Sequence, residues 1–103
     1  MIIVLGSVRI QEGRIEEALV LSQEHVRRSH AEPGCIEHGV SQDSEVPGRL
    51  VFVERWASIE SLHAHFAVTD SRKFGQTLSA LAVEPPSIAL YETGEIKPGK
   101  TAA

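Results

Sequence analysis

The carboxylate of Glu54 is the group whose surroundings most favour chemistry. Its neighbours on one face of the expected strand are Leu50, Phe52 and Trp56, because side chains alternate along a strand. Burying an ionised carboxylate among apolar groups is costly unless it is paired, and burial raises its pKa until it can act as an acid or a base. The alternative is a structural ion pair with Arg9 or Arg55, from the same subunit or a second one. Residue type alone favours the ion pair.

Trp56 is the only tryptophan in the chain, and it closes the same strand. Its indole ring offers a wall against which a flat ligand can stack. The competing interpretation is an ordinary core residue, which a large aromatic side chain at this position more often is.

The histidines are the groups suited to metal binding or proton transfer; they are His25, His30, His38, His63 and His65. On a helix His63 and His65 diverge by about 200°, and His25 and His30 diverge by about 140°. No single segment therefore presents two imidazoles to one ion. A ligand set built from distant elements stays open, but no spacing points to one, and we expect no metal site. His38 lies in mid-strand and faces either the helix-covered layer or the opposite face. His65 flanks an apolar stripe, which suits an imidazole facing a cavity, although a hydrogen-bonded structural role is the commoner one.

Several other kinds of chemistry have no support in the sequence. Cys35 follows Pro-Gly at a strand start, where a small buried thiol is expected rather than a nucleophile. Glycine-rich phosphate loops and the Gly-x-Ser-x-Gly pattern are absent, which argues against nucleotide cofactors and serine hydrolysis.

The elements that must position these groups follow from hydrophobic periodicity. Strands are predicted over 2–10, 35–42, 49–57 and 87–96. Helices are predicted over 13–31, from Ser58 onward and over 70–82. The apolar stripe of the first helix is Ile15, Leu19, Ser22 and Val26, and that of the second is Ile59, Leu62 and Phe66. The order βαββαβ is the ferredoxin-like arrangement, an α+β fold with one antiparallel sheet and its helices on one face.

The strands do not alternate cleanly between apolar and polar residues. In the third strand Leu50 and Phe52 lie on one face, while Val51 and Val53 lie on the other. A sheet that meets water on one face should alternate, and the helices suffice to cover only one face. We therefore expect a homodimer in which two sheets face each other.

Composition defines the class of protein. The chain has 103 residues, which fits one domain over 1–96 followed by a polar tail over 97–103. Its net charge is −4, from 10 Lys and Arg against 14 Asp and Glu, and clustered basic residues for nucleic acid or an anionic membrane are missing. No apolar run approaches a membrane span, no signal peptide is visible, and a single cysteine fits a reducing compartment. We expect a cytoplasmic protein without nucleic-acid or membrane partners.

Three stretches of the chain together resemble one family. They are Glu32–Ile36, Pro47–Trp56 and Ser58–Phe66. The combination of Glu-Pro-Gly-Cys, Glu-x-Trp and Ala-His-Phe is similar to the antibiotic biosynthesis monooxygenase superfamily, and most similar to its small quinol-monooxygenase-like members. The resemblance implies a dimeric α+β barrel, with a hydrophobic cavity between the helices and the sheet of each subunit.

The resemblance also implies an activity. Relatives include oxygenases that need no cofactor and oxidise quinols or polyketides with O₂ after deprotonating them. It makes Glu54 or His65 the candidate base and Trp56 the stacking wall. The further expected contacts with a small aromatic or quinol-like substrate are Phe52, Phe66, His38 and Tyr91. Neither a metal nor another cofactor is expected.

The sequence departs from the family pattern at three places. It contains no asparagine, and Gly6-Ser7-Val8 stands where polyketide-type and haem-degrading relatives carry one. Gln76-Thr77-Leu78 replaces the region of the haem ligand, and Asp70 replaces a second histidine. Two alternatives therefore stay open: a dimeric protein that binds a small ligand without turnover and, with less support, an isomerase of the same superfamily.

Overall fold

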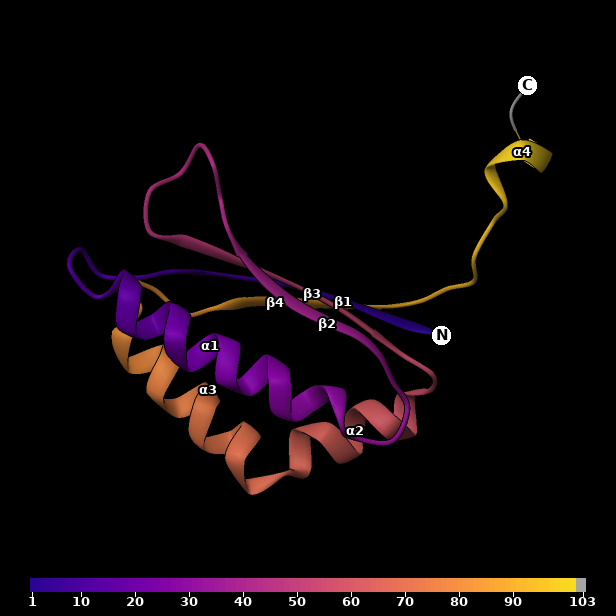
Figure 1. Cartoon of the computed structure of the whole chain (residues 1–103), viewed down its shortest axis with the longest axis horizontal. Coiled ribbons are helices and arrows are strands. Elements are labelled where there is room, and N and C mark those ends of the chain that lie inside the picture. Colours follow the sequence, from indigo (N-terminus) through magenta and orange to yellow (C-terminus); the bar gives the residue numbers. More distant parts are fainter. Residues whose placement is uncertain (102–103) are drawn as a thin grey trace.

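A four-stranded antiparallel sheet carries the three longer helices on one of its faces (Figure 1). The computed structural model describes residues 1–101. Its elements, in chain order, are β1 (Ile2–Arg9), α1 (Ile15–His30), β2 (Cys35–Gln42), β3 (Arg49–Trp56), α2 (Ile59–Ala67), α3 (Thr69–Leu81), β4 (Ser87–Glu92) and α4 (Pro98–Thr101). The strand order is β2-β3-β1-β4, which confirms the α+β, ferredoxin-like prediction.

Local signals explain where the second helical region begins and divides. The Ser58 side chain caps α2 by accepting a hydrogen bond from the Ser61 backbone N–H, and the Ser61 hydroxyl oxygen accepts one from the Ser58 backbone N–H. This capping box satisfies donors that a helix start leaves free. Val68 is extended and separates α2 from α3.

The predicted C-terminal region differs from the structure in two respects. The last strand ends at Glu92 rather than continuing to residue 96. The tail, expected to be frayed, contains a short helical turn over Pro98–Thr101, and residues 102 and 103 lie outside the described residues.

The buried face of α1 matches the predicted stripe only in part: Ser22 is buried as predicted, and Ile15 and Leu19 pack against the core. The buried residues are Ala18, Ser22, His25 and Ser29, whereas Ile15, Leu19 and Val26 are only partly covered. Apart from His25 these side chains are small, and the hydroxyls of Ser22 and Ser29 each donate to the carbonyl four residues earlier, at 2.7 Å. Such local bonds satisfy a hydroxyl without water, so this face can lie against the rest of the fold with His25 in its middle.

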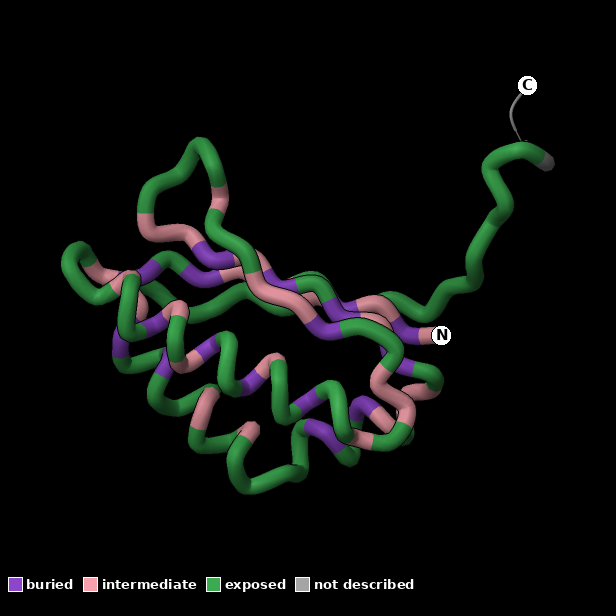
Figure 2. Tube along the Cα trace, viewed as in Figure 1, coloured by how far each residue is buried: buried purple, intermediate pink, exposed green. Residues whose placement is uncertain are grey.

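The core lies between the sheet and the helices, where Figure 2 shows buried segments of both. It consists of two groups of buried side chains. One is Val8, Ile10, Ala18, Leu50, Phe52, Leu78 and Leu81, and the other is Ile2, Val4, Trp56 and Leu62. The cross-strand register pairs Val4 with Glu54 and Gly6 with Phe52, so Glu54 points toward the helices.

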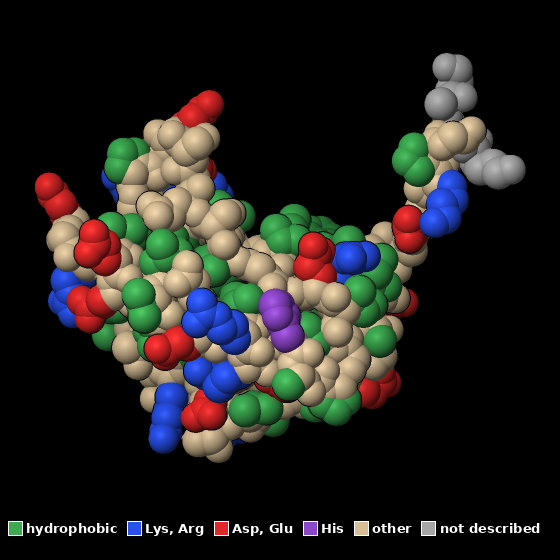
Figure 3. Space-filling model, in the orientation of Figure 1, with side chains coloured by type: hydrophobic (Ala, Val, Ile, Leu, Met, Phe, Trp, Pro, Cys, Tyr) green, Lys and Arg blue, Asp and Glu red, His purple; other side chains and the backbone are tan. Residues whose placement is uncertain are grey.

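The opposite face of the sheet is apolar and uncovered in the single chain. Leu5 is 46% exposed, Val53 40% and Tyr91 52%, and the register places Leu5 beside Val53 and Tyr91 beside Ile3. On the molecular face drawn in Figure 3, acidic and basic side chains are interspersed. Within the described residues, no helix has both the length and the apolar character needed to cross a membrane.

Candidate active site

A cavity of about 250 Å³ lies between the sheet and the helices. Gly6, Phe52 and Glu54 line it from the sheet. Its helical wall includes Phe74, Gly75 and Leu78 of α3, and three imidazoles border it: His25, His38 and His65. A mostly apolar cavity with a few converging polar groups is the usual form of a small-molecule site.

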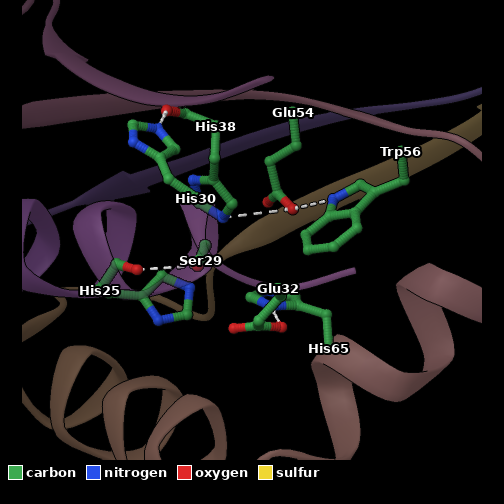
Figure 4. A network of polar contacts seen from close by, with 8 residues as sticks. All are labelled: His25, Ser29, His30, Glu32, His38, Glu54, Trp56 and His65. Carbon is green, nitrogen blue, oxygen red and sulfur yellow. Dashed lines mark hydrogen bonds and ion pairs between the residues drawn. The ribbon is translucent and has the colours of Figure 1, made fainter. Parts of the chain in front are cut away.

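Glu54 is a buried carboxylate, and no arginine or lysine among the described residues forms an ion pair with it. Its side chain is 9% exposed, the Trp56 Nε1–H donates to its Oε1 at 2.9 Å, and the His38 Nε2 lies 3.3 Å from the same oxygen (Figure 4). Burial raises the pKa of Glu54, against the opposing effect of the Trp56 hydrogen bond. The expected pairing with Arg55 is wrong within the chain, because Arg55 binds Glu37 at 2.8 Å.

The imidazoles of His25, His38 and His65 converge although they come from α1, β2 and α2 (Figure 4). Their ring centroids are 5.1 Å apart for His25 with His38, 5.1 Å for His25 with His65, and 5.5 Å for His38 with His65. Each residue offers a ring nitrogen within 4.8 Å of the others. All three are buried. Such a cluster can hold a metal ion or donate and accept hydrogen bonds to a ligand.

Two of these imidazoles are held in the neutral form. Burial, followed by the electrostatic effect of neighbouring basic groups, lowers the pKa of His25 and of His38 to about 3. The 3.3 Å approach of His38 to Glu54 is therefore not an ion pair at neutral pH, and its alignment is not that of a hydrogen bond. The His25 Nδ1 and both ring nitrogens of His38 have no hydrogen-bond partner among the described residues. Unpartnered buried polar atoms are costly, which makes them candidates for ligand contacts.

His65 and His38 are positioned by a second layer of contacts. The His65 Nδ1 lies 2.8 Å from Glu32 Oε1, and its ring is tilted against the Trp56 ring at 4.6 Å. The His30 Nε2–H donates to the backbone carbonyl of His38 at 2.8 Å. These contacts fix the orientation of imidazoles that face the cavity.

The predicted site residues divide into two groups. Glu54, His65, His38, Phe52 and Phe66 all border the cavity. Trp56 does not border it: its side chain is fully buried and contacts the cavity residues Glu54, His65 and His38.

Tyr91 lies away from the cavity. It pairs with Ile3 on the open face of the sheet and is 52% exposed.

Sequence reasoning missed four residues that shape the site: His25, Glu32, Phe74 and Gly75. His25 stacks on Phe74, with ring centroids 4.0 Å apart and planes 9° apart. A signal was present, because His25 falls at helical spacing with the small residues Ala18, Ser22 and Ser29. Glu32 lies 33 positions before His65, and no pattern in the neighbouring sequence indicates that the two side chains meet.

Comparison with known proteins identifies the family. A family model described as antibiotic biosynthesis monooxygenase matches residues 1–77. An uncharacterised protein of Synechocystis sp. is 29% identical over 94 residues, which is 91% of this chain but only 64% of that protein's length.

Solved structures agree with that result. A Deinococcus radiodurans protein, provisionally assigned to the antibiotic biosynthesis monooxygenases, is 26% identical with a TM-score of 0.89, covering 94% of this chain and 96% of its own. An antibiotic biosynthesis monooxygenase structure at 24% identity has a TM-score of 0.85, covers 92% of this chain and all of its own, and supports the fold. The chain belongs to the antibiotic biosynthesis monooxygenase family.

Proposed function

We propose that this protein oxidises a small quinol-like or phenolic compound with O₂ in the cavity beside Glu54, without help from an organic cofactor. The observation that carries the proposal is a buried carboxylate with a raised pKa facing an apolar cavity, in a chain of a monooxygenase family. The volume of about 250 Å³ lies just below the range of about 300–1,000 Å³ that is usual for ligand sites. A substrate of one or two rings fits better than a large polyketide.

Glu54 is the proposed general base. Desolvation makes its carboxylate more basic than an exposed glutamate, and the Trp56 N–H fixes one oxygen and leaves the other available. Removal of a substrate proton yields an electron-rich phenolate or enolate. The N–H of neutral His38, which lacks a partner among the described residues, is a donor for the developing oxygen charge.

The overall reaction can draw all of its electrons from the substrate. For a substrate with an activated CH₂ group, the anion gives electrons to O₂ and a carbon–oxygen bond forms. One oxygen atom then remains as C=O, and the other leaves as water with the two hydrogens of the CH₂ group. A hydroquinone instead loses two electrons and two protons to give a quinone and H₂O₂. The apolar walls Phe52 and Phe74 keep water from the reacting anion.

Oxygen consumption tests this proposal. Chelator-treated, flavin-free protein is mixed with a panel of hydroquinones and anthrones, and products formed under ¹⁸O₂ are analysed by mass spectrometry. We expect Glu54→Gln to lower kcat/KM by at least about 100-fold, the usual scale for loss of a general base. Glu24→Gln, on the exposed side of α1, is the matched control and should leave the rate unchanged.

Two results would count against the proposal in different ways. Binding of panel members without oxygen uptake would establish a ligand-binding protein instead of an oxygenase. Oxygen uptake that Glu54→Gln leaves intact would remove Glu54 as the base and direct attention to His65, the other candidate.

We further propose that the working unit is a homodimer formed through the open face of the sheet. Leu5, Val53 and Tyr91 are 46%, 40% and 52% exposed there, on neighbouring strands. Contiguous exposed apolar side chains favour association, and a second copy presents the same surface in return.

A further inference from the structure

Three buried imidazoles that converge on one point resemble the ligand set of a metal ion more than a packed core. The ligand nitrogens of His25, His38 and His65 lie within 4.8 Å of one another. Zinc–imidazole bonds of about 2.1 Å in tetrahedral geometry place such nitrogens about 3.4 Å apart. Each ring therefore has to move inward by less than about 1 Å, which small side-chain rotations supply.

The nitrogens of this cluster have lone pairs to give. The His25 Nδ1 and both nitrogens of His38 lack hydrogen-bond partners among the described residues. A bound ion would satisfy atoms that the packed protein leaves unsatisfied.

Glu32 completes a feature that is common around metal sites. Its Oε1 lies 2.8 Å from the His65 Nδ1. In a neutral ring this nitrogen is the protonated one, and its N–H donates a hydrogen bond to the carboxylate. The lone pair then lies on the other nitrogen, Nε2. Metal-binding histidines usually donate their second N–H to a carboxylate or carbonyl in this manner.

Charge also favours a cation at this position. Glu54 is buried, and His38, at 3.3 Å, is its only basic neighbour in contact among the described residues. A divalent ion among the imidazoles would supply the missing positive charge in a place where water does not screen it. All three imidazoles border the cavity, so an ion held by them would be accessible to a small ligand.

We propose that His25, His38 and His65 bind one divalent first-row transition-metal ion at the wall of the cavity. Three imidazole ligands suit Zn²⁺, Co²⁺, Ni²⁺ or Cu²⁺ rather than Mg²⁺ or Ca²⁺, which prefer oxygen. The proposal concerns binding alone and goes beyond the oxidation described above, which is measured on chelator-treated protein without added metal.

Titration of tag-free, chelator-treated protein with Zn²⁺ by calorimetry, and with Co²⁺ by visible absorption, tests the site. We expect one ion per chain and Co²⁺ bands typical of a site with nitrogen ligands. His25→Phe preserves a ring against Phe74 and should weaken Zn²⁺ binding by at least 100-fold. Glu32→Gln should weaken it by about 10- to 100-fold. His63→Ala, an exposed histidine on α2, is the control and should bind like the original protein.

Far-ultraviolet circular dichroism checks that each variant folds, and His65→Gln replaces His25→Phe if the latter does not. The proposal is overturned if the original protein binds no stoichiometric Zn²⁺. It is equally overturned if a folded His25→Phe or His65→Gln variant binds Zn²⁺ as tightly as the original protein. Because no substrate or oxygen is present, either result is independent of the proposed oxidation.

Discussion

At the scale of single residues, the buried imidazoles make stability depend on pH. Their ordinary pKa is 6.5, and in the folded protein that of His25 and His38 is lowered to about 3. As the pH falls below 6.5, these two histidines bind protons in the unfolded chain but not in the folded protein. The free energy of unfolding that they contribute above pH 6.5 is therefore lost progressively toward pH 3. Glu54 has the opposite effect. Because its pKa is raised in the folded protein, its ionisation as the pH rises lowers the free energy of unfolding.

His25→Phe isolates one imidazole from this balance. Metal-free protein should lose about 1 kcal/mol for each of His25 and His38 between pH 7.5 and 5.5, and the variant should lose correspondingly less. Urea unfolding at several pH values measures the difference in slope. His63→Ala should keep the original slope, since His63 is exposed. Identical slopes for the original protein and His25→Phe would mean that His25 is protonated in the folded state.

At this scale the sequence predicted the direction of a side chain correctly where neighbouring residues on the same strand show an alternating pattern. The alternation of β3 identified Glu54 and Phe52 as facing one way. It failed where the partner is distant: Glu32 beside His65, and His25 beside His38. The comparison of helical angles considered only pairs of histidines within one segment, whereas the members of the cluster come from three different elements.

At the scale of elements, the turn before β2 packs closely against the start of α2. Gly34 has φ +83°, and a Cβ added there would lie 2.4 Å from the Ser61 Cβ. Ser61 belongs to the capping box of α2, the helix that carries His65. Gly13 has nearly the same φ, +84°, but nothing lies within 4 Å of its added Cβ.

These two glycines form a matched pair. Gly13→Ala should cost about 1 kcal/mol of unfolding free energy, the price of a left-handed backbone. Gly34→Ala should cost about 1–3 kcal/mol more, because the added methyl group also overpacks against the Ser61 side chain. Urea denaturation of both variants measures the difference. Equal losses would show that the contact with Ser61 relaxes freely.

Element boundaries were predictable because turn residues mark them. Pro33-Gly34 and Pro47-Gly48 stand at the predicted breaks, and Gly34 and Gly48 both have positive φ. The buried face of α1 was not predictable by hydrophobicity, because small and polar residues, Ala18, Ser22 and Ser29, face inward there. On this helix, close packing against the rest of the fold requires small side chains, whether or not they are hydrophobic.

At the scale of the whole molecule, the apolar pattern on both strand faces was the informative signal. One face is covered by helices, and Leu5, Val53 and Tyr91 remain exposed on the other. Neither the fold nor the cavity depends on that second face within one chain, so only an association measurement tests what covers it.

A charge placed in the middle of the open face should separate the proposed dimer. Val53 lies beside Leu5 there, and Val53→Glu would bury two unpaired carboxylates, one from each copy. A cost of about 3 kcal/mol or more raises the dimer Kd by at least about 100-fold. Val20→Glu on α1, where the valine is 55% exposed, carries the same change outside the sheet and should leave the dimer intact. Sedimentation equilibrium at micromolar concentration distinguishes the masses, and a monomer mass for the original protein would refute the sheet-to-sheet assembly.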